Sequence, residues 1–154
     1  MPFIILRAFR YNNEKEAYLA DFRYHNDVIK CRIMGDFKKH LAIAIEKLSA
    51  LKDAYDKKHF TVVGDLATKV CEQLVEADAA RDGKHFGTHL DRHDFSNKRY
   101  PKEINDAMRK IWFAYGDLGY DGVNGKRAKL VIDNLKIILN YFGKRFGEKI
   151  AENI

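Results

Sequence analysis

The sequence predicts a mainly α protein, an antiparallel four- to five-helix bundle with a small N-terminal β-meander or extension. From about residue 35 onward, apolar side chains recur at intervals of three and four residues, which is the period of an amphipathic helix. Only two of the 154 residues are proline, Pro2 and Pro101, so long uninterrupted helices are permitted. With 46% apolar residues, a chain of this length can bury the core of one domain. We therefore divide it into an N-terminal β-rich extension, residues 1–34, and a helical bundle, residues 35–154.

The extension carries the period of a β-strand. Residues 3–10 are apolar and β-prone, and residues 18–25 and 28–34 alternate in character from one position to the next. Polar, turn-forming residues separate these runs. We expect a three-stranded antiparallel meander. The alternative is a helix over residues 13–23, whose Glu and Ala residues favour it.

Two amphipathic helices follow the extension. Asp36 can cap the first of them, and its predicted buried positions are Leu41, Ile45, Leu48, Leu51 and Tyr55. The second begins near Thr61 and ends at Gly83, the natural left-handed stop. Its predicted buried positions are Val63, Leu66, Val70, Leu74 and Ala77.

A histidine-rich connector, residues 84–99, separates these helices from the last two. It has room for a short helix, and Thr88 with Asp91 three residues later resembles a capping box. Pro101 suits the first turn of a third long helix, whose predicted buried positions are Ile104, Met108, Ile111, Tyr115 and Leu118. Glycines at 116, 119, 122 and 125 mark a loop, and a last helix runs from Gly125 to Ile150. Its predicted inward positions are Val131, Leu135, Ile138, Phe142 and Phe146.

Composition and charge limit the classes of function. The formal net charge of +6, from 28 basic and 22 acidic residues, favours polyanionic partners. Two isolated cysteines, Cys31 and Cys71, suit a reducing compartment. No run approaches the ~20 apolar residues that span a membrane, and no secretory signal is present. We expect a cytoplasmic protein with no membrane contact and no cofactor.

Three segments resemble the HEPN superfamily of helical-bundle proteins. Residues 65–77 resemble its central helix, residues 84–89 its histidine-bearing connector, and residues 108–121 the segment before its last helix. The resemblance covers residues 36–150 and rests on the order of helices and on scattered positions.

This resemblance implies a homodimer that binds RNA or a nucleotide. Nucleases of the family carry an Arg, four to six residues and then a His. Here Arg109 occupies the Arg position, but the corresponding downstream residues are Ala114, Tyr115 and Gly116. We therefore expect a degenerate nuclease site and leave enzymatic activity open. The candidate catalytic residues are Arg109, Tyr115, His85 and His89.

Basic residues define the expected nucleic-acid contact. We expect it at Arg109, Lys110, Lys126 and Arg127. Arg109 lies near Trp112 and Tyr115 and could hold a phosphate beside a stacked base, although a solvent-reaching Arg beside a core Trp is an equally ordinary arrangement. The basic face of the last helix could equally be a solvated surface.

Two further hypotheses belong to other classes of function. His85, His89 and His93 are spaced by four and could bind a first-row metal in a metal-dependent enzyme. Gly83 and Gly87 argue against one helix carrying all three, and a polar connector with solvated or hydrogen-bonded imidazoles is the more ordinary explanation. The other hypothesis is a non-catalytic interaction module whose N-terminal strands pair with a partner. The sequence contains no phosphate-binding loop, GxSxG or HExxH motif.

Overall fold

The computed structural model describes residues 36–121 and 125–150, without the side chains of residues 117–121. The described residues form five helices: a first helix over residues 36–56, then α2 (Phe60–Ala80), α3 (His89–Arg99), α4 (Lys102–Asp121) and α5 (Gly125–Phe146). The predicted helical bundle is confirmed. The predicted β-meander and its helical alternative both lie outside the described residues.

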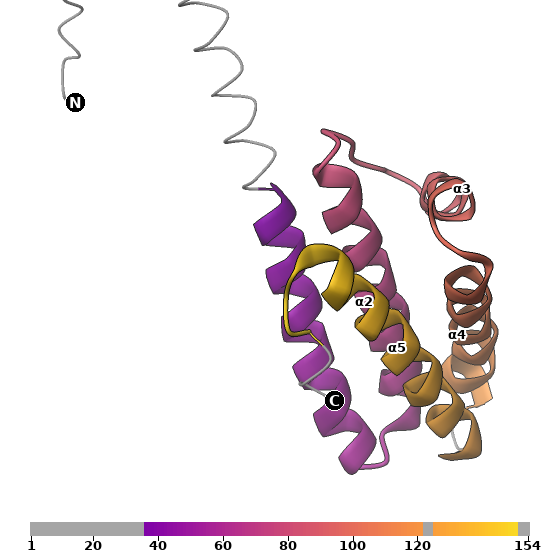
Figure 1. The fold of residues 1–154 in the computed structure, drawn as a ribbon. Coiled ribbons are helices and arrows are strands. Elements are labelled where there is room, and N and C mark those ends of the chain that lie inside the picture. Colours follow the sequence, from indigo (N-terminus) through magenta and orange to yellow (C-terminus); the bar gives the residue numbers. More distant parts are fainter. Residues whose placement is uncertain (1–35, 122–124, 151–154) are drawn as a thin grey trace, which may run out of the picture.

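The four long helices lie side by side and alternate in direction, as Figure 1 shows. α2 contacts both α4 and α5, and α4 contacts α5 along its length. The short helix α3 lies near the end of the bundle where α2 stops and α4 begins, and it contacts both of these helices. The connector therefore brings its histidines against the middle and end of α2.

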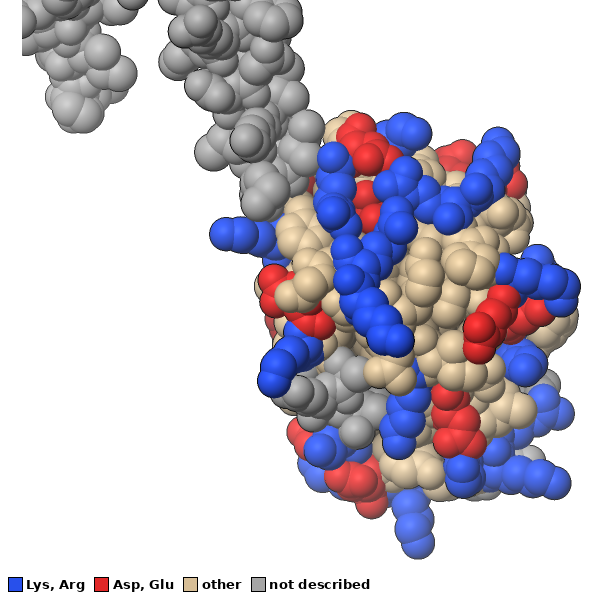
Figure 2. All heavy atoms as spheres, viewed as in Figure 1, with Lys and Arg blue, Asp and Glu red and all other residues tan. Residues whose placement is uncertain are grey.

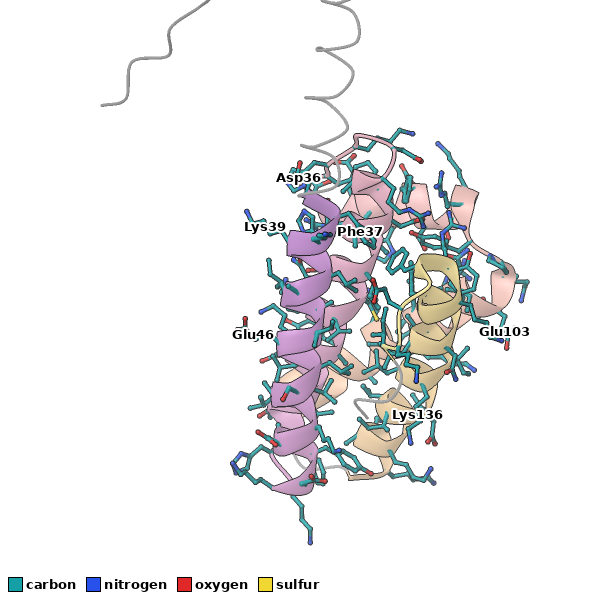
Figure 3. The ribbon with its side chains drawn as sticks, turned by 60° about the vertical axis from the view of Figure 1, so that its left-hand side comes forward. Asp36, Phe37, Lys39, Glu46, Glu103 and Lys136 are labelled. Carbon is teal, nitrogen blue, oxygen red and sulfur yellow. The ribbon has the colours of Figure 1, made fainter. Side chains whose placement is uncertain are left out.

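The first helix joins the bundle through its apolar face. Phe37 points toward the bundle, where its ring meets that of Phe146 edge-on at 5.1 Å, while Lys39 and Glu46 project from the outer face (Figure 3). Ile45 was predicted to be buried, but it is exposed, and Ala44 is buried in its place. The buried positions of this helix are Leu41, Ala44, Leu48, Leu51 and Ala54, and Tyr55, also predicted to be buried, is only half-buried.

The core contains most of the other predicted inward positions. These are Val63, Val70, Leu74, Ala77, Ile104, Met108, Ile111, Val131, Leu135, Ile138 and Phe142. Leu66, Tyr115 and Phe146 are only half-buried, and the side chain of Leu118 lies outside the described residues. Burial of this apolar surface is the main term that stabilises the bundle.

Local chemistry accounts for several helix boundaries. Gly83 has a φ of 68°, which confirms the predicted left-handed stop after α2. Thr88 caps α3: its hydroxyl accepts a hydrogen bond from the Asp91 amide at 3.2 Å and donates one to the Asp91 carboxylate at 2.6 Å. The predicted N-cap at Thr88 is thus confirmed, but the Asp91 carboxylate bonds the Thr88 hydroxyl and not the Thr88 amide that a capping box would use.

Two predicted boundaries of the last helices were wrong. Gly116 and Gly119 lie inside α4, which continues to Asp121, because an isolated helical Gly costs only about 1 kcal/mol relative to Ala. α5 ends at Phe146 rather than at Ile150, since Gly147 has a φ of 72°. Beyond it the chain folds back, the amide of Glu148 donates to the carbonyl of Gly143 at 3.0 Å, and Ile150 is buried.

Substituting Gly143 tests how the chain folds back after α5, and substituting Gly116, a helical glycine in α4, provides the control. A Cβ at Gly143 would lie 2.9 Å from the Glu148 carbonyl oxygen, whereas one at Gly116 would meet nothing within 4 Å. We expect Gly143→Ala to lose ~1–3 kcal/mol of unfolding free energy through the clash. Gly116→Ala should gain about 0.5–1 kcal/mol, because Ala loses less entropy in a helix. Urea unfolding measures both, and equal stability of the two variants would contradict the fold-back at the end of α5.

Candidate functional site

Three carboxylates of α2 lie on its buried side. Glu72 is 6% exposed, Glu76 1% and Asp78 0%. An isolated buried carboxylate is strongly unfavourable, so each requires cationic or hydrogen-bonding partners. The partners come from the connector, from α3 and from α5, and they determine how these segments lie on α2.

Asp78 joins three elements at one end of the bundle. Its Oδ2 accepts hydrogen bonds from Arg99 Nε and the Tyr100 hydroxyl, both at 3.1 Å, and its Oδ1 accepts one from Arg145 Nε at 2.8 Å. Burial, followed by the negative charge of Asp78, raises the pKa of Tyr100 far above its usual range. The hydrogen bond to Asp78 also raises the pKa of Arg145. With its lone pairs occupied, Asp78 serves as a structural anchor and not as a general base.

Glu76 holds the connector against α2. Its Oε1 accepts a hydrogen bond from Arg92 Nε at 2.6 Å, and its Oε2 accepts one from the Phe86 amide at 3.2 Å. Arg92 also donates to the Phe86 carbonyl at 3.0 Å. His85 Nδ1 lies 2.9 Å from Glu76 Oε2. One buried carboxylate thereby fixes both the backbone before α3 and the histidine beside it.

Glu72 lies one helical turn before Glu76 and faces His89. Lys69 Nζ is 2.9 Å from Glu72 Oε2, and His89 Nδ1 is 2.5 Å from Oε1. Oε1 is buried and accepts no hydrogen bond of good geometry within the described part of the chain. Glu72 therefore keeps one oxygen whose hydrogen-bonding capacity is not fully used.

A cleft of about 330 Å³ opens beside this pair. Its lining comes from α2, α3 and α4: Asp65, Thr68, Lys69, His89, Trp112 and Tyr115. The rings of His89 and His93 contact the indole of Trp112 edge-on, with centroids 5.2 and 4.5 Å away. Two histidine rings therefore pack against Trp112, whose side chain is partly exposed. The cleft offers aromatic surface, a cation and a carboxylate within one concavity.

The four predicted catalytic candidates do not lie together in the structure. Tyr115 and His89 line the cleft, but Arg109 and His85 do not. Arg109 is exposed on α4, where it donates to Asp106 at 3.2 Å and to Asn97 at 3.4 Å. The pKa of Asp106 is lowered, chiefly by its hydrogen bond with Lys102. In the described part of the chain, the four candidates Arg109, Tyr115, His85 and His89 therefore do not line one cleft.

The remaining basic candidates lie on the surface. Lys110 borders a shallow hollow with Lys102 and Asp106, and Lys126 and Arg127 are exposed in the first turn of α5. On the face in Figure 2, Lys and Arg side chains gather near the upper end of α5 and are elsewhere interspersed with Asp and Glu. This face has a mixed charge and forms no continuous basic groove.

The proposed metal triad is also divided. α3 begins at His89, so His85 precedes the helix and does not share a face with His89 and His93. His89 and His93 flank Trp112, whereas the His85 ring stacks on that of His40 at 5.6 Å. In the described ranges, the ligand-bearing group with atoms within 4.8 Å of one another is His40, Glu76 and His85.

Sequence reasoning missed the contributions of α2. Lys69, Glu72 and Glu76 were treated as ordinary helix residues, although Glu72 and Glu76 interrupt a run of buried apolar positions at an interval of four. Charges inside an apolar face are uncommon without a partner. That pattern was the available signal for a buried ion-pair site.

The comparisons with known proteins supply no functional assignment. The chain matches no protein family, no curated protein and no solved structure. Among the described helices, none is long and apolar enough to cross a membrane.

Cys71 is the buried thiol nearest to the carboxylate row. Burial, followed by the charge of Glu72, raises its pKa from 9.0 to about 12. A thiol is nucleophilic only as the thiolate, so Cys71 stays protonated at neutral pH. It is a core residue and not a catalytic nucleophile.

We expect the folded chain with Cys31→Ser to resist alkylation by iodoacetamide between pH 7 and pH 9. The raised pKa of Cys71 leaves almost no thiolate over that range, and burial excludes the reagent. Mass spectrometry should show complete labelling only after urea is added. Labelling of the native chain that accelerates around pH 8.5, as for an ordinary thiol, would contradict the buried position of Cys71.

Proposed function

We propose that this chain is a HEPN-like, homodimeric helical protein that binds RNA or a nucleotide through the cleft between α2, α3 and α4. The observation that carries the proposal is Trp112, which is partly exposed and lines a cleft that also contains Lys69 and Tyr115. The family resemblance and the net charge of +6 point to the same class of ligand.

The aromatic residues suit a base. The ring of Trp112 is restrained, because the rings of His89 and His93 contact it in T-shaped arrangements. A base that stacks on such a ring contributes ~1–3 kcal/mol and needs no particular sequence. Asp65, at the rim of the same cleft, can accept hydrogen bonds from a base amino group or a ribose hydroxyl.

The cations suit the backbone of a strand. Lys69 is half-exposed, and its ammonium contacts Glu72 through one carboxylate oxygen, which leaves donors for a phosphate. Arg109 and Lys110 precede Trp112 on α4 by less than one turn and are exposed. A strand with one base in the cleft would extend its neighbouring phosphates toward them. Lys126 and Arg127 are the candidates for contacts further along.

Cleavage is not part of the proposal. No His follows Arg109 in the chain, and Arg109 lies outside the cleft. Tyr115 lines the same cleft as Trp112, so it is assigned to base contact. The interaction-module hypothesis rests on residues 1–34, outside the described ranges.

The single Trp of the chain makes this proposal directly measurable. We expect a single-stranded RNA oligomer to quench the fluorescence of Trp112 with saturation at low salt, where phosphate binding is strongest. In a fluorescence-anisotropy titration with labelled RNA, Trp112→Ala should weaken binding by about 5- to 150-fold, which corresponds to the loss of ~1–3 kcal/mol of stacking. Lys69→Gln should weaken binding and reduce the salt slope by about one.

Phe113→Ala is the matched control. This neighbouring aromatic residue is 77% exposed and does not line the cleft, so its loss should leave RNA affinity unchanged. Absence of any RNA or nucleotide binding at low salt would contradict the proposal. Equal weakening by Phe113→Ala and Trp112→Ala would place binding elsewhere.

A further inference from the structure

A cluster of imidazoles and a carboxylate lies outside the cleft, where three segments of the chain meet. His40 comes from the first helix, Glu76 from α2 and His85 from the connector. We propose that His40, Glu76 and His85 form a binding site for one first-row divalent cation, with zinc as the best fit. This site does not depend on the proposed RNA binding.

The distances between the groups suit a shared cation. The three residues each offer a ligand atom, and these atoms lie within 4.8 Å of one another. With Zn–N and Zn–O bonds of about 2.1 Å, two ligands at a tetrahedral angle stand about 3.4 Å apart. His85 Nδ1 and Glu76 Oε2 are already 2.9 Å apart, so a cation could bridge them after a small movement. His85 lies in the connector between α2 and α3, where such an adjustment is easily made.

The surroundings prepare each ligand for coordination. His40 Nδ1 lies 2.8 Å from Gln73 Oε1, which can only accept a hydrogen bond. The tautomer that donates this hydrogen bond from Nδ1 leaves Nε2 as the nitrogen that would bind a cation. Histidine ligands commonly have their second nitrogen fixed in this way, which orients the ring and selects the tautomer.

The two carboxylate oxygens of Glu76 have different partners. Its Oε1 accepts the hydrogen bond from Arg92 Nε at 2.6 Å, and its Oε2 lies 2.9 Å from His85 Nδ1. Arg92 and the Phe86 amide hold the carboxylate in position, as outer hydrogen bonds do at metal centres. A carboxylate that is 1% exposed cannot turn away to solvent when a cation arrives.

The ligand types select the class of metal. Two imidazoles and one carboxylate suit Zn²⁺ and its first-row neighbours, whereas Mg²⁺ and Ca²⁺ prefer oxygen ligands alone. His85 is 71% exposed, which gives a cation a route from solvent. Three protein ligands also leave a coordination position for water.

This site differs from the histidine triad that sequence spacing suggests. Both include His85, but the structural site uses His40 and excludes His93, whose ring faces Trp112. Substituting each histidine in turn therefore distinguishes the two arrangements.

The test is a Zn²⁺ titration of the full-length, metal-free chain against a chromogenic chelator, with Mg²⁺ as a comparison. We expect one Zn²⁺ per chain with micromolar affinity or better and no competition from Mg²⁺. His40→Gln and His85→Gln should each weaken zinc binding by about tenfold or more, since even second-layer partners contribute that much. His93→Gln is the matched control and should bind as the parent chain does.

Thermal unfolding supplies a second readout. Zinc that joins the first helix, α2 and the connector should raise the unfolding midpoint of the parent chain and of His93→Gln, because a ligand stabilises the state it binds. His85→Gln should fold normally, since its side chain is exposed, and should lose this increase. No zinc uptake at micromolar concentrations, unchanged affinity in His40→Gln, or equal loss in His93→Gln and His85→Gln would each overturn the proposed site.

Discussion

The burial of carboxylates inside α2 is the constraint on which the rest of the structure depends. Glu72, Glu76 and Asp78 lie where a helix of this bundle would ordinarily place apolar residues. Leaving one buried charge without its partner costs about 3–5 kcal/mol, a large part of a typical domain's stability of about 5–15 kcal/mol. The fold is therefore acceptable only when the connector, α3 and α5 supply their cations and hydrogen-bond donors.

The ion pairs and hydrogen bonds of these carboxylates hold the polar connector, residues 84–88, in place on α2. Apolar contacts alone would hold residues 84–88 poorly, because most of their side chains are exposed. Glu76 instead binds both the Phe86 amide and Arg92, and Arg92 closes the loop through the Phe86 carbonyl. The positions of His85 beside His40 and of His89 beside Trp112 both follow from this arrangement. The candidate cleft and the candidate cation site are thus two consequences of one row of acids.

The candidate cleft and the candidate cation site are adjacent to neighbouring turns of α2. Glu72 and Glu76 are one helical turn apart, which corresponds to about 6 Å along the axis. Glu72 pairs with His89, which lines the aromatic cleft, and Glu76 pairs with His85, whose ring stacks on that of His40. The candidate cleft and the candidate cation site therefore lie next to each other along α2.

Sequence pattern predicted the elements of this fold better than the site. The period of three and four found the long helices, and Thr88 with Asp91 and Gly83 located a cap and a stop correctly. Ile45 was misplaced because Ala44 is a smaller and less conspicuous apolar residue on the true inward face. The glycines of α4 suggested a loop because Gly lowers helix propensity only modestly, and tertiary contacts can override it.

The site could not be assembled in advance, because its members are distant in sequence. Lys69 and Trp112 meet across two helices, and His40 reaches Gln73 over 33 positions. Periodicity gives the face of a helix but not the partner that the face meets. The acids of α2 carried the one usable signal, since charge in an apolar stripe requires a partner.

A double-mutant cycle between Glu76 and Arg92, followed by urea unfolding, tests the central role of the buried acids most directly. Glu76→Leu leaves Arg92 without its partner, and Arg92→Leu leaves the buried Glu76 carboxylate without its charged partner at Oε1, so we expect each to cost ~3–5 kcal/mol. The double variant replaces both charges with apolar groups and should cost much less than the two single changes together. Additive costs, equal within about 0.5 kcal/mol, would contradict the dependence of the connector on this buried pair.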